Sequence, residues 1–286
     1  MNLIRAEVLG YCMGVRRAVH MAREELAAAA GAYRVYTLGP LIHNPRVLEQ
    51  LRCQGMEALD ETDLPEGLGA AALIIRAHGI SPQWEAALVR SGARLVDATC
   101  PKVKHSQMKA RSLAQGGYRV FLAGERHHGE VIGIQGYAPQ CLVIADPVEA
   151  REAAEQLYQE APAAKTALLG QTTIAPDEYR GIAAAIQASF PDLEIIDTIC
   201  RATMDRQQAV LKLCAQVDAL VVVGGRESAN TRRLLALAQA QGKQAWLVEA
   251  VSDIPAEIRA YPVVGLAAGA STPEDLIDHI AAALIT

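Results

Sequence analysis

The feature that most constrains the fold is a cysteine that recurs three times at the end of an apolar stretch. Cys12, Cys100 and Cys200 each close such a stretch, and each is followed by a basic, helix-forming segment. The last two cysteines end the same pattern, Asp-x-x-Cys. Neighbouring members are about one third of the chain apart, which predicts three similar α/β lobes with one cysteine each.

Short apolar runs alternate with amphipathic segments along the chain, which predicts α/β architecture with mostly parallel sheets. We expect strands at residues 34–38, 72–76, 94–97, 119–123, 141–145, 166–169, 193–197, 219–223, 244–248 and 263–267. We expect helices at residues 15–29, 85–91, 103–115, 177–188, 205–215 and 231–241. The predicted lobes are residues 13–99, 100–197 and 198–286, the last of them with an N-terminal strand within residues 1–12.

Composition narrows the function classes. The formal net charge of −5 and the low aromatic content of 4% argue against a general nucleic-acid binder. No stretch reaches the ~18 apolar residues of a membrane helix, and charged residues interrupt the first segment, so we expect a cytoplasmic protein. Six cysteines in such a chain favour metal binding, catalysis or burial over a disulfide framework.

The recurring cysteines lie where ligands bind in open α/β sheets, outside the carboxyl ends of strands. A helix N-terminus there favours a thiolate. Three equivalent positions indicate metal ligation, and the metal is either zinc or an iron–sulfur cluster, because no CxxC pair decides between them. The other cysteines lie within helical or strand patterns and are interpreted as structural. They are Cys53, Cys141 and Cys214.

Three histidines repeat this placement at predicted strand ends: His43, His78 and His128. Imidazole N–H groups donate to phosphate oxygens, although a histidine taken alone is more often a loop or core residue than a ligand-binding group. Glu130 follows His128 by two residues, and in extended chain both would point to one face. Glu130 is then a candidate general acid, with an ordinary surface glutamate as the alternative.

Two further segments predict anion sites at strand-to-helix turns, residues 221–231 and 269–274. Simple helix capping is the alternative: Ser271 with Glu274 fits a capping box, and Asn230 or Thr231 can cap the helix that follows. The run Gln171-Thr172-Thr173 adds hydroxyl groups after another predicted strand.

Taken in order, these motifs resemble the family of 4-hydroxy-3-methylbut-2-enyl diphosphate reductases (LytB/IspH), from Cys12 to Ser271. The segments that carry the resemblance are Gly10–Val15, Gly39–Asn44, Arg76–Gly79, Asp97–Pro101, His128–Val131, Gln171–Thr173, Thr198–Cys200, Ser228–Asn230 and Gly269–Pro273. The resemblance implies a trefoil of three similar α/β lobes around a central iron–sulfur cluster.

The family resemblance also implies roles for single residues. Cys12, Cys100 and Cys200 would ligate a [4Fe–4S] cluster and leave one iron open. The implied catalytic residues are Glu130, Thr172 and His128. The implied substrate-binding residues are His43, His78, His128, Thr172, Ser228, Ala229, Asn230 and Ser271. The expected reaction removes an allylic hydroxyl from the diphosphate substrate and yields isopentenyl and dimethylallyl diphosphate, with electrons from a ferredoxin or flavodoxin.

The sequence departs from the family pattern at Tyr11, Gly129 and Ala229, where the family commonly has Phe, Pro and Ser. Ala229 matters most, because it cannot donate its side chain to a phosphate oxygen. Two other functions stay open at this point. One is a non-catalytic three-lobed protein that uses the cysteines for zinc or redox sensing, and the other is a diverged reductase of another phosphorylated alcohol.

Overall fold

The computed structural model describes residues 1–60 and 68–285, and within these residues the chain forms three four-stranded parallel sheets. The chain divides into two compact units. Unit 1 consists of Met1–Arg16, Ile42–Cys53 and Arg201–Thr286, and unit 2 of Arg17–Leu41 and Gln54–Cys200. Among the described helices, none combines the length and apolar character that crossing a membrane requires.

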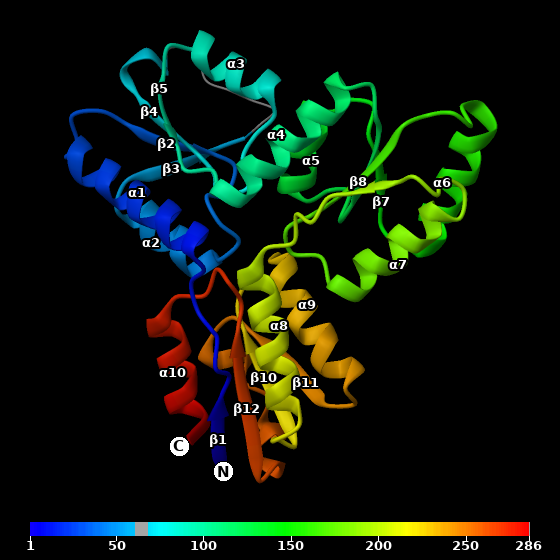
Figure 1. Ribbon diagram of the computed structural model, residues 1–286. Helices are drawn as coiled ribbons and strands as arrows, with labels where there is room; N and C mark the ends of the chain where they lie inside the picture. Colours follow the sequence, from blue (N-terminus) through cyan, green and yellow to red (C-terminus); the bar gives the residue numbers. More distant parts are fainter. Residues whose placement is uncertain (61–67, 286) are drawn as a thin grey trace. The chain divides into compact units, whose positions relative to one another are not determined.

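Unit 1 contains sheet A, with the strand order β1-β12-β10-β11 (Figure 1). Its strands are β1 (Asn2–Arg5), β10 (Ala219–Val223), β11 (Gln244–Val248) and β12 (Val263–Ala268). Its helices are α2 (Pro45–Cys53), α8 (Arg201–Cys214), α9 (Ala229–Ala240), α10 (Glu274–Ile285) and the short η2 (Val251–Asp253) and η3 (Ala256–Ala260). Alternate side chains of β10 point to opposite faces: Leu220 packs with α8 and α9, and Val221 packs with α10.

Unit 2 contains sheet B, in the order β3-β2-β4-β5, and sheet C, in the order β7-β6-β8-β9. Sheet B consists of β2 (Val35–Leu38), β3 (Met56–Leu59), β4 (Ala72–Ile75) and β5 (Arg94–Asp97). Sheet C consists of β6 (Arg119–Ala123), β7 (Leu142–Ile144), β8 (Thr166–Gly170) and β9 (Glu194–Ile195). The helices are α1 (Met13–Ala29), which starts in unit 1, η1 (Leu68–Ala70), α3 (Pro82–Arg90), α4 (Pro101–Gln115), α5 (Gly129–Tyr137), α6 (Pro147–Glu160) and α7 (Pro176–Gln187).

The three sheets share one topology. In chain order, the first strand pairs with both the second and the third, and the fourth pairs with the third. In sheet A the fourth strand is β1, which comes from the N-terminus, so this lobe is a circular permutation of the other two. The helices after the first and third strands cover opposite faces in sheets A and C. Between those two strands lies the crevice in which such sheets bind ligands.

The α/β class and the parallel sheets confirm the prediction. Each sheet lies within one predicted lobe range, whereas residues 42–53 belong to the unit that holds sheet A. The boundaries 13–99, 100–197 and 198–286 stay a prediction. The predicted ranges do not include β3, α2, α5, α6 or the short η1, η2 and η3, and for α10 only the strand-to-helix turn at its start was predicted. The apolar run before Cys12 is also not a strand, because β1 ends at Arg5.

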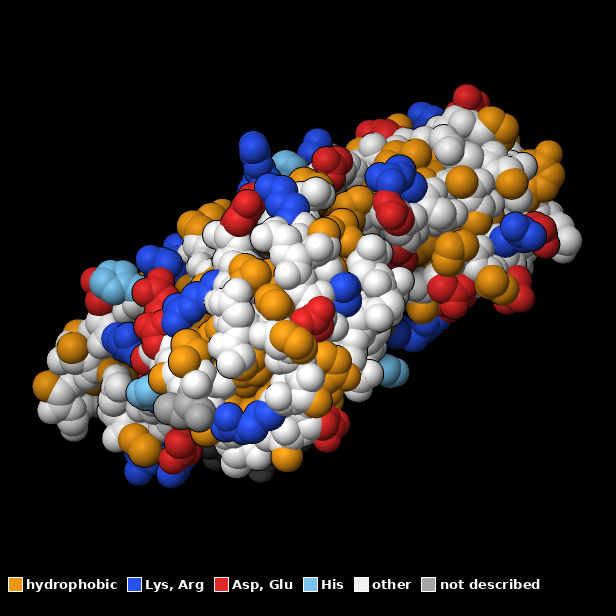
Figure 2. Space-filling model, turned by 90° about the horizontal axis from the view of Figure 1, so that it is seen from below, with side chains coloured by type: hydrophobic (Ala, Val, Ile, Leu, Met, Phe, Trp, Pro, Cys, Tyr) orange, Lys and Arg blue, Asp and Glu red, His pale blue; other side chains and the backbone are white. Residues whose placement is uncertain are grey.

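Charged side chains of both signs cover the surface. On the face that Figure 2 shows, the described Lys and Arg side chains are interspersed with Asp and Glu rather than gathered into a stripe of one sign. Exposed ion pairs such as Arg5–Asp278 and Lys212–Glu7 fit this distribution. Exposed pairs of this kind contribute about 0–1 kcal/mol each to stability, so the folding energy resides in the apolar cores.

Candidate functional site

Each recurring cysteine immediately precedes a helix. Cys12 comes before α1, Cys100 is the N-cap residue of α4, and Cys200 comes before α8. All three are of intermediate exposure, and none of them forms a disulfide bond within the described residues. The amide of Val15 donates to the Cys12 sulfur at 3.4 Å, as a first-turn amide does to a capping group. The three cysteines therefore lie at the positive ends of helix dipoles.

The backbone holds the three cysteines in the same way. The amide of Cys12 donates to the carbonyl of Ala270 at 3.0 Å, that of Cys100 to Ala77 at 2.9 Å, and that of Cys200 to Thr172 at 2.9 Å. Each acceptor lies two residues beyond the third strand of its sheet, β12, β4 or β8. The three-fold pattern of the sequence thus corresponds to a repeated hydrogen bond inside each lobe.

The donor set fits an iron–sulfur cluster. Thiolates are the ligands of such clusters, and amide donors at a helix N-terminus stabilise them. The remaining cysteines offer no comparable setting. Cys53 is exposed at the end of α2, and burial raises the pKa of the Cys141 thiol to about 11. Burial also raises the pKa of Cys214, which lies in the apolar cluster beside α8. Both buried thiols therefore stay protonated at neutral pH.

Glu130 is a buried carboxylate that Thr172 holds with two hydrogen bonds. The Thr172 amide donates to Oε1 at 2.7 Å, and the Thr172 hydroxyl donates to Oε2 at 2.9 Å. Only 2% of Glu130 is exposed. The carbonyl of Thr172 accepts the amide of Cys200, so a continuous chain of hydrogen bonds and covalent bonds joins the carboxylate to a cysteine.

The expectation of an extended chain from His128 to Glu130 is wrong. His128 is the N-cap of α5, and its Nδ1 accepts the amide of Glu130 at 3.2 Å. Glu130 lies in the first turn of that helix. The surface-glutamate alternative is also wrong, because the side chain is buried. This helix is hard to predict from sequence, because α5 is apolar and rich in glycine and therefore lacks a polar face.

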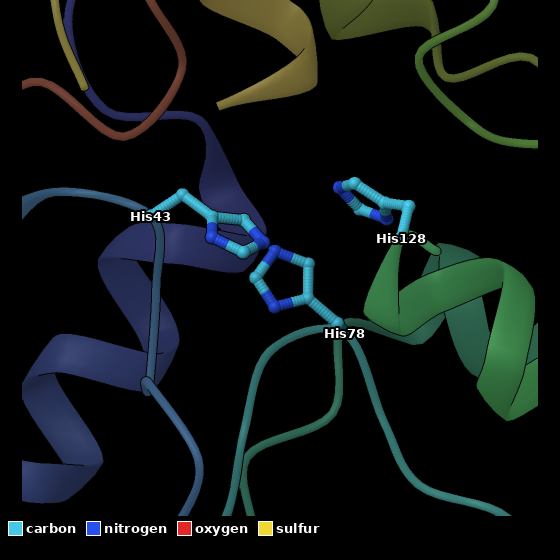
Figure 3. Close-up of side chains that lie close together, drawn as sticks. All are labelled: His43, His78 and His128. Atoms are coloured by element: carbon cyan, nitrogen blue, oxygen red, sulfur yellow. The ribbon is translucent and has the colours of Figure 1, made fainter. Parts of the chain in front are cut away.

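His78 and His128 lie close together in unit 2. Their rings pack edge to face, with centroids 5.3 Å apart (Figure 3). Glycines of α5 permit close packing against this region: a Cβ on Gly136 would collide with the Ser81 Cβ, and one on Gly133 would lie 3.2 Å from the Gln107 Nε2. The glycines of α5 therefore have a packing role, which the sequence pattern did not indicate.

In unit 1, His43 lies on the loop before α2 and packs against the ends of β10 and β12. The Ser271 hydroxyl donates to the His43 carbonyl at 2.9 Å. A Cβ on Gly225 would lie 2.6 Å from that same oxygen, so the position requires glycine. The capping-box interpretation of Ser271 is wrong, because its hydroxyl is used in this contact and α10 begins at Glu274.

The start of α9 offers buried polar groups. Ser228, and not Asn230 or Thr231, is the N-cap residue, and it accepts the Thr231 amide at 3.3 Å. Asn230 is 4% exposed, and within residues 1–60 and 68–285 neither atom of its carboxamide has a hydrogen-bond partner. A buried amide without partners is costly, which makes this side chain a candidate for binding a ligand. Ala229, between Ser228 and Asn230, is 2% exposed.

The binding residues expected from the sequence share one topological place. They follow the first and third strands of the sheets: His43 and His78 follow β2 and β4, and His128 and Thr172 follow β6 and β8. Ser228 and Ser271 follow β10 and β12. Within each lobe this is the crevice in which open α/β sheets bind ligands, and helix N-termini there favour anions.

Comparison with known proteins identifies close relatives. The sequence profile described as "LytB protein" matches residues 3–285. The 4-hydroxy-3-methylbut-2-enyl diphosphate reductase of Treponema denticola is 45% identical, with 96% of each chain covered. The reductase of Aquifex aeolicus is 37% identical, with 98% of this chain and 94% of that protein covered.

Two solved structures are similar over the whole chain. The E-1-hydroxy-2-methyl-but-2-enyl-4-diphosphate reductase of Plasmodium falciparum superposes with a TM-score of 0.91 at 29% identity. The alignment covers 100% of this chain and 88% of that one. A second structure, described as the terminal enzyme of the non-mevalonate pathway, has a TM-score of 0.70 at 34% identity, with 99% of both chains covered.

Proposed function

Because the chain belongs to the LytB family, we propose that it reduces 4-hydroxy-3-methylbut-2-enyl diphosphate to isopentenyl diphosphate and dimethylallyl diphosphate. The reaction consumes two electrons and two protons and releases the allylic hydroxyl as water. It is the last step of the methylerythritol phosphate route to isoprenoids. The observation that carries the proposal is the buried Glu130 carboxylate, linked through Thr172 to the amide of Cys200.

Cys12, Cys100 and Cys200 are assigned as the ligands of a [4Fe–4S] cluster with one open iron. Such a cluster, when bound, supplies single electrons and a Lewis-acid iron. The shared backbone anchoring of these three residues supports the assignment. Exposure of Cys53 and the raised thiol pKa values of Cys141 and Cys214 disfavour the other cysteines. Three protein ligands leave a coordination position for substrate, as catalytic metal sites do.

The diphosphate group binds at the crevices of the lobes. At such a crevice in unit 1, the N-terminus of α9 presents its first-turn amides and the positive end of its dipole to the phosphate. The unpartnered carboxamide of Asn230 donates to a phosphate oxygen there. The complete set of binding residues is His43, His78, His128, Thr172, Ser228, Ala229, Asn230 and Ser271.

Glu130 delivers the proton that turns the leaving hydroxyl into water. Both of its oxygens are oriented by Thr172, so the carboxyl group is held in one geometry before substrate binds. His128 fixes the first turn of α5, which carries Glu130. Pre-orientation of this kind is what an efficient general acid requires.

Electrons come from a small one-electron carrier of the cytoplasm, a ferredoxin or a flavodoxin. The proposed cluster accepts single electrons, whereas the reaction consumes two. The carrier therefore has to bind twice in each catalytic cycle. A partner that docks and leaves repeatedly fits a small interface of low affinity.

Turnover by the purified protein tests the proposal. Protein purified without oxygen is mixed with 4-hydroxy-3-methylbut-2-enyl diphosphate and a reduced viologen dye. We expect both isoprenyl diphosphates to appear. Protein that carries an intact iron–sulfur cluster but does not turn over would point to another phosphorylated alcohol. Inactive protein that contains zinc would favour the non-catalytic interpretation.

Replacing Ala229 by Ser is expected to lower KM for the diphosphate substrate. The first turn of α9 would gain a hydroxyl donor beside Asn230, and a hydrogen bond to a charged group contributes about 1.5–3 kcal/mol, or about ten- to 150-fold in affinity. Ala236→Ser, on the exposed face of the same helix, is the control and should leave KM unchanged. An Ala229→Ser enzyme with the KM of the wild type would contradict the assignment of this turn to the diphosphate.

A further inference from the structure

Arg17 forms two hydrogen bonds with the backbone of the loop that leads to Cys100. Its Nη1 donates to the carbonyl of Thr99 and its Nη2 to the carbonyl of Asp97, both at 3.1 Å. Arg17 is in α1, and Thr99 immediately precedes the cysteine. The planar guanidinium thus spans two carbonyls and fixes the backbone between the end of β5 and Cys100.

Arg206 makes the corresponding contact with the loop that leads to Cys12. Its Nη2 donates to the carbonyl of Gly10 at 2.5 Å, and its Nη1 donates to the carbonyl of Ala202 at 2.8 Å. The side chain is 3% exposed, and it joins the start of α8 to a loop nearly 200 positions away in the sequence. The two contacts together tie α8 to the segment after β1.

The two arginines have equivalent places in their lobes. Arg17 is in α1, the helix before the first strand of sheet B, and Arg206 is in α8, the helix before β10 of sheet A. Each side chain reaches the loop that follows the fourth strand of the same sheet, β5 or β1. In the lobe of sheet C, a threonine hydroxyl rather than a guanidinium binds the backbone near the cysteine. There the Thr198 hydroxyl donates to the Gly170 carbonyl at 2.7 Å and accepts the Gly170 amide at 2.8 Å. Ser106, in the corresponding helix α4, bonds within its own helix instead.

We propose that Arg17 and Arg206 are positioning residues for Cys100 and Cys12. Each guanidinium donates to a backbone carbonyl one or two residues before a cysteine and so brings a positive charge to the loop that carries it. The inference rests on the assignment of these cysteines as cluster ligands. Groups that orient metal ligands typically change metal affinity by about ten- to 100-fold, and a nearby cation favours the more negative, reduced state of a cluster.

The test compares arginines of the same helix. Arg17→Met removes the hydrogen bonds to the Asp97 and Thr99 carbonyls together with one positive charge. Arg16→Met also removes one positive charge, but from a side chain that forms only an exposed ion pair, with Glu274. The first readout is the rate at which an iron chelator bleaches the visible absorbance of the cluster. The second is the midpoint potential. We expect Arg17→Met to lose its cluster about ten- to 100-fold faster than Arg16→Met and to have a lower midpoint potential.

Arg206→Met is compared in the same way with Lys212→Met, an exposed position of α8. If Arg206→Met does not fold, Arg206→Lys replaces it. Lysine keeps the charge but lacks the planar fork, so Arg17→Lys and Arg206→Lys should keep the potential while the cluster bleaches faster than in wild type.

Equal bleaching rates and potentials for Arg17→Met and Arg16→Met would overturn the proposal. The failure of the proposed function looks different, because then the wild-type protein itself would hold no cluster. A wild-type protein that holds a cluster, together with an Arg17→Met variant indistinguishable from Arg16→Met, would remove only the positioning role. Circular dichroism of every variant separates loss of the cluster from loss of the fold.

Discussion

Glu130→Gln is expected to lower kcat by about 10²–10⁴-fold while iron, sulfide and KM stay near the wild-type values. Gln has the shape of Glu, and its Oε1 still accepts the Thr172 amide that now bonds to Glu130 at 2.7 Å. The Thr172 hydroxyl can rotate to accept from the new amide group, so the buried side chain keeps its partners. What disappears is the proton that an acid delivers to the leaving hydroxyl.

A buried carboxylate elsewhere provides the control. Glu25 is 8% exposed and bonded to Tyr33 and Arg94, so Glu25→Gln should reduce stability and leave kcat unchanged. The pH dependence of kcat adds a second measurement, because one ionisation should vanish from the Glu130→Gln profile. A Glu130→Gln enzyme that turns over at nearly the wild-type rate would exclude this residue as the acid.

Replacing Thr172 distinguishes the positioning of Glu130 from its delivery of a proton. Thr172→Val keeps the backbone amide on Oε1 and removes only the hydroxyl bond to Oε2. We therefore expect a smaller loss of kcat than in Glu130→Gln, with the cluster retained because the carbonyl of residue 172 still accepts the Cys200 amide.

Much of the fold could be predicted because its strands are short apolar runs. Strands such as β8 and β10 are buried on both faces, and parallel strands of this kind appear in sequence as continuous aliphatic segments. Once strands alternate with helices, the carboxyl ends of the strands are the expected place for a site. Cys100 and Cys200, each three residues after an aspartate, were therefore recognisable as functional candidates.

The geometry around Glu130 could not be predicted. The helix α5 has no amphipathic period, and its N-cap is His128 rather than one of the preferred capping residues Ser, Thr, Asp or Asn. Nothing local in the sequence then distinguishes a helix start from an extended segment. The pairing of Glu130 with Thr172 joins the first turn of α5 to a loop 42 residues away and depends on the adjacency of β6 and β8.

Contacts to backbone carbonyls are equally hidden from sequence reasoning. Arg17 and Arg206 bind carbonyls 82 and 196 residues away. Because every residue has a backbone carbonyl, the identity of the acceptor residue does not reveal such a contact. The same holds for Ser271, whose hydroxyl bonds to the backbone of His43. Local pattern favoured a capping box there, and tertiary structure determined the actual partner.

Replacing Cys12, Cys100 or Cys200 by Ser is expected to remove most of the iron and sulfide from the protein, and turnover with them. Serine occupies nearly the same volume, and the anchoring bonds to Ala270, Ala77 and Thr172 are made by the backbone, so the fold should persist. The alcohol is not deprotonated near neutral pH and is a poor ligand for iron. The loss of cluster affinity should exceed the factor of about ten to 100 that is typical when a group that orients a metal ligand is removed.

The other three cysteines make the comparison decisive. Cys53→Ser changes an exposed thiol and should alter neither iron content nor stability. Cys141→Ser and Cys214→Ser bury a hydroxyl, which costs about 1–3 kcal/mol if it lacks a partner, so iron is measured per folded chain. With their raised pKa values, these two thiols stay protonated at pH 8 and should react slowly with alkylating agents. Equal iron content in the two sets of variants would refute the ligand assignment, because the shared backbone anchoring would then serve the fold alone.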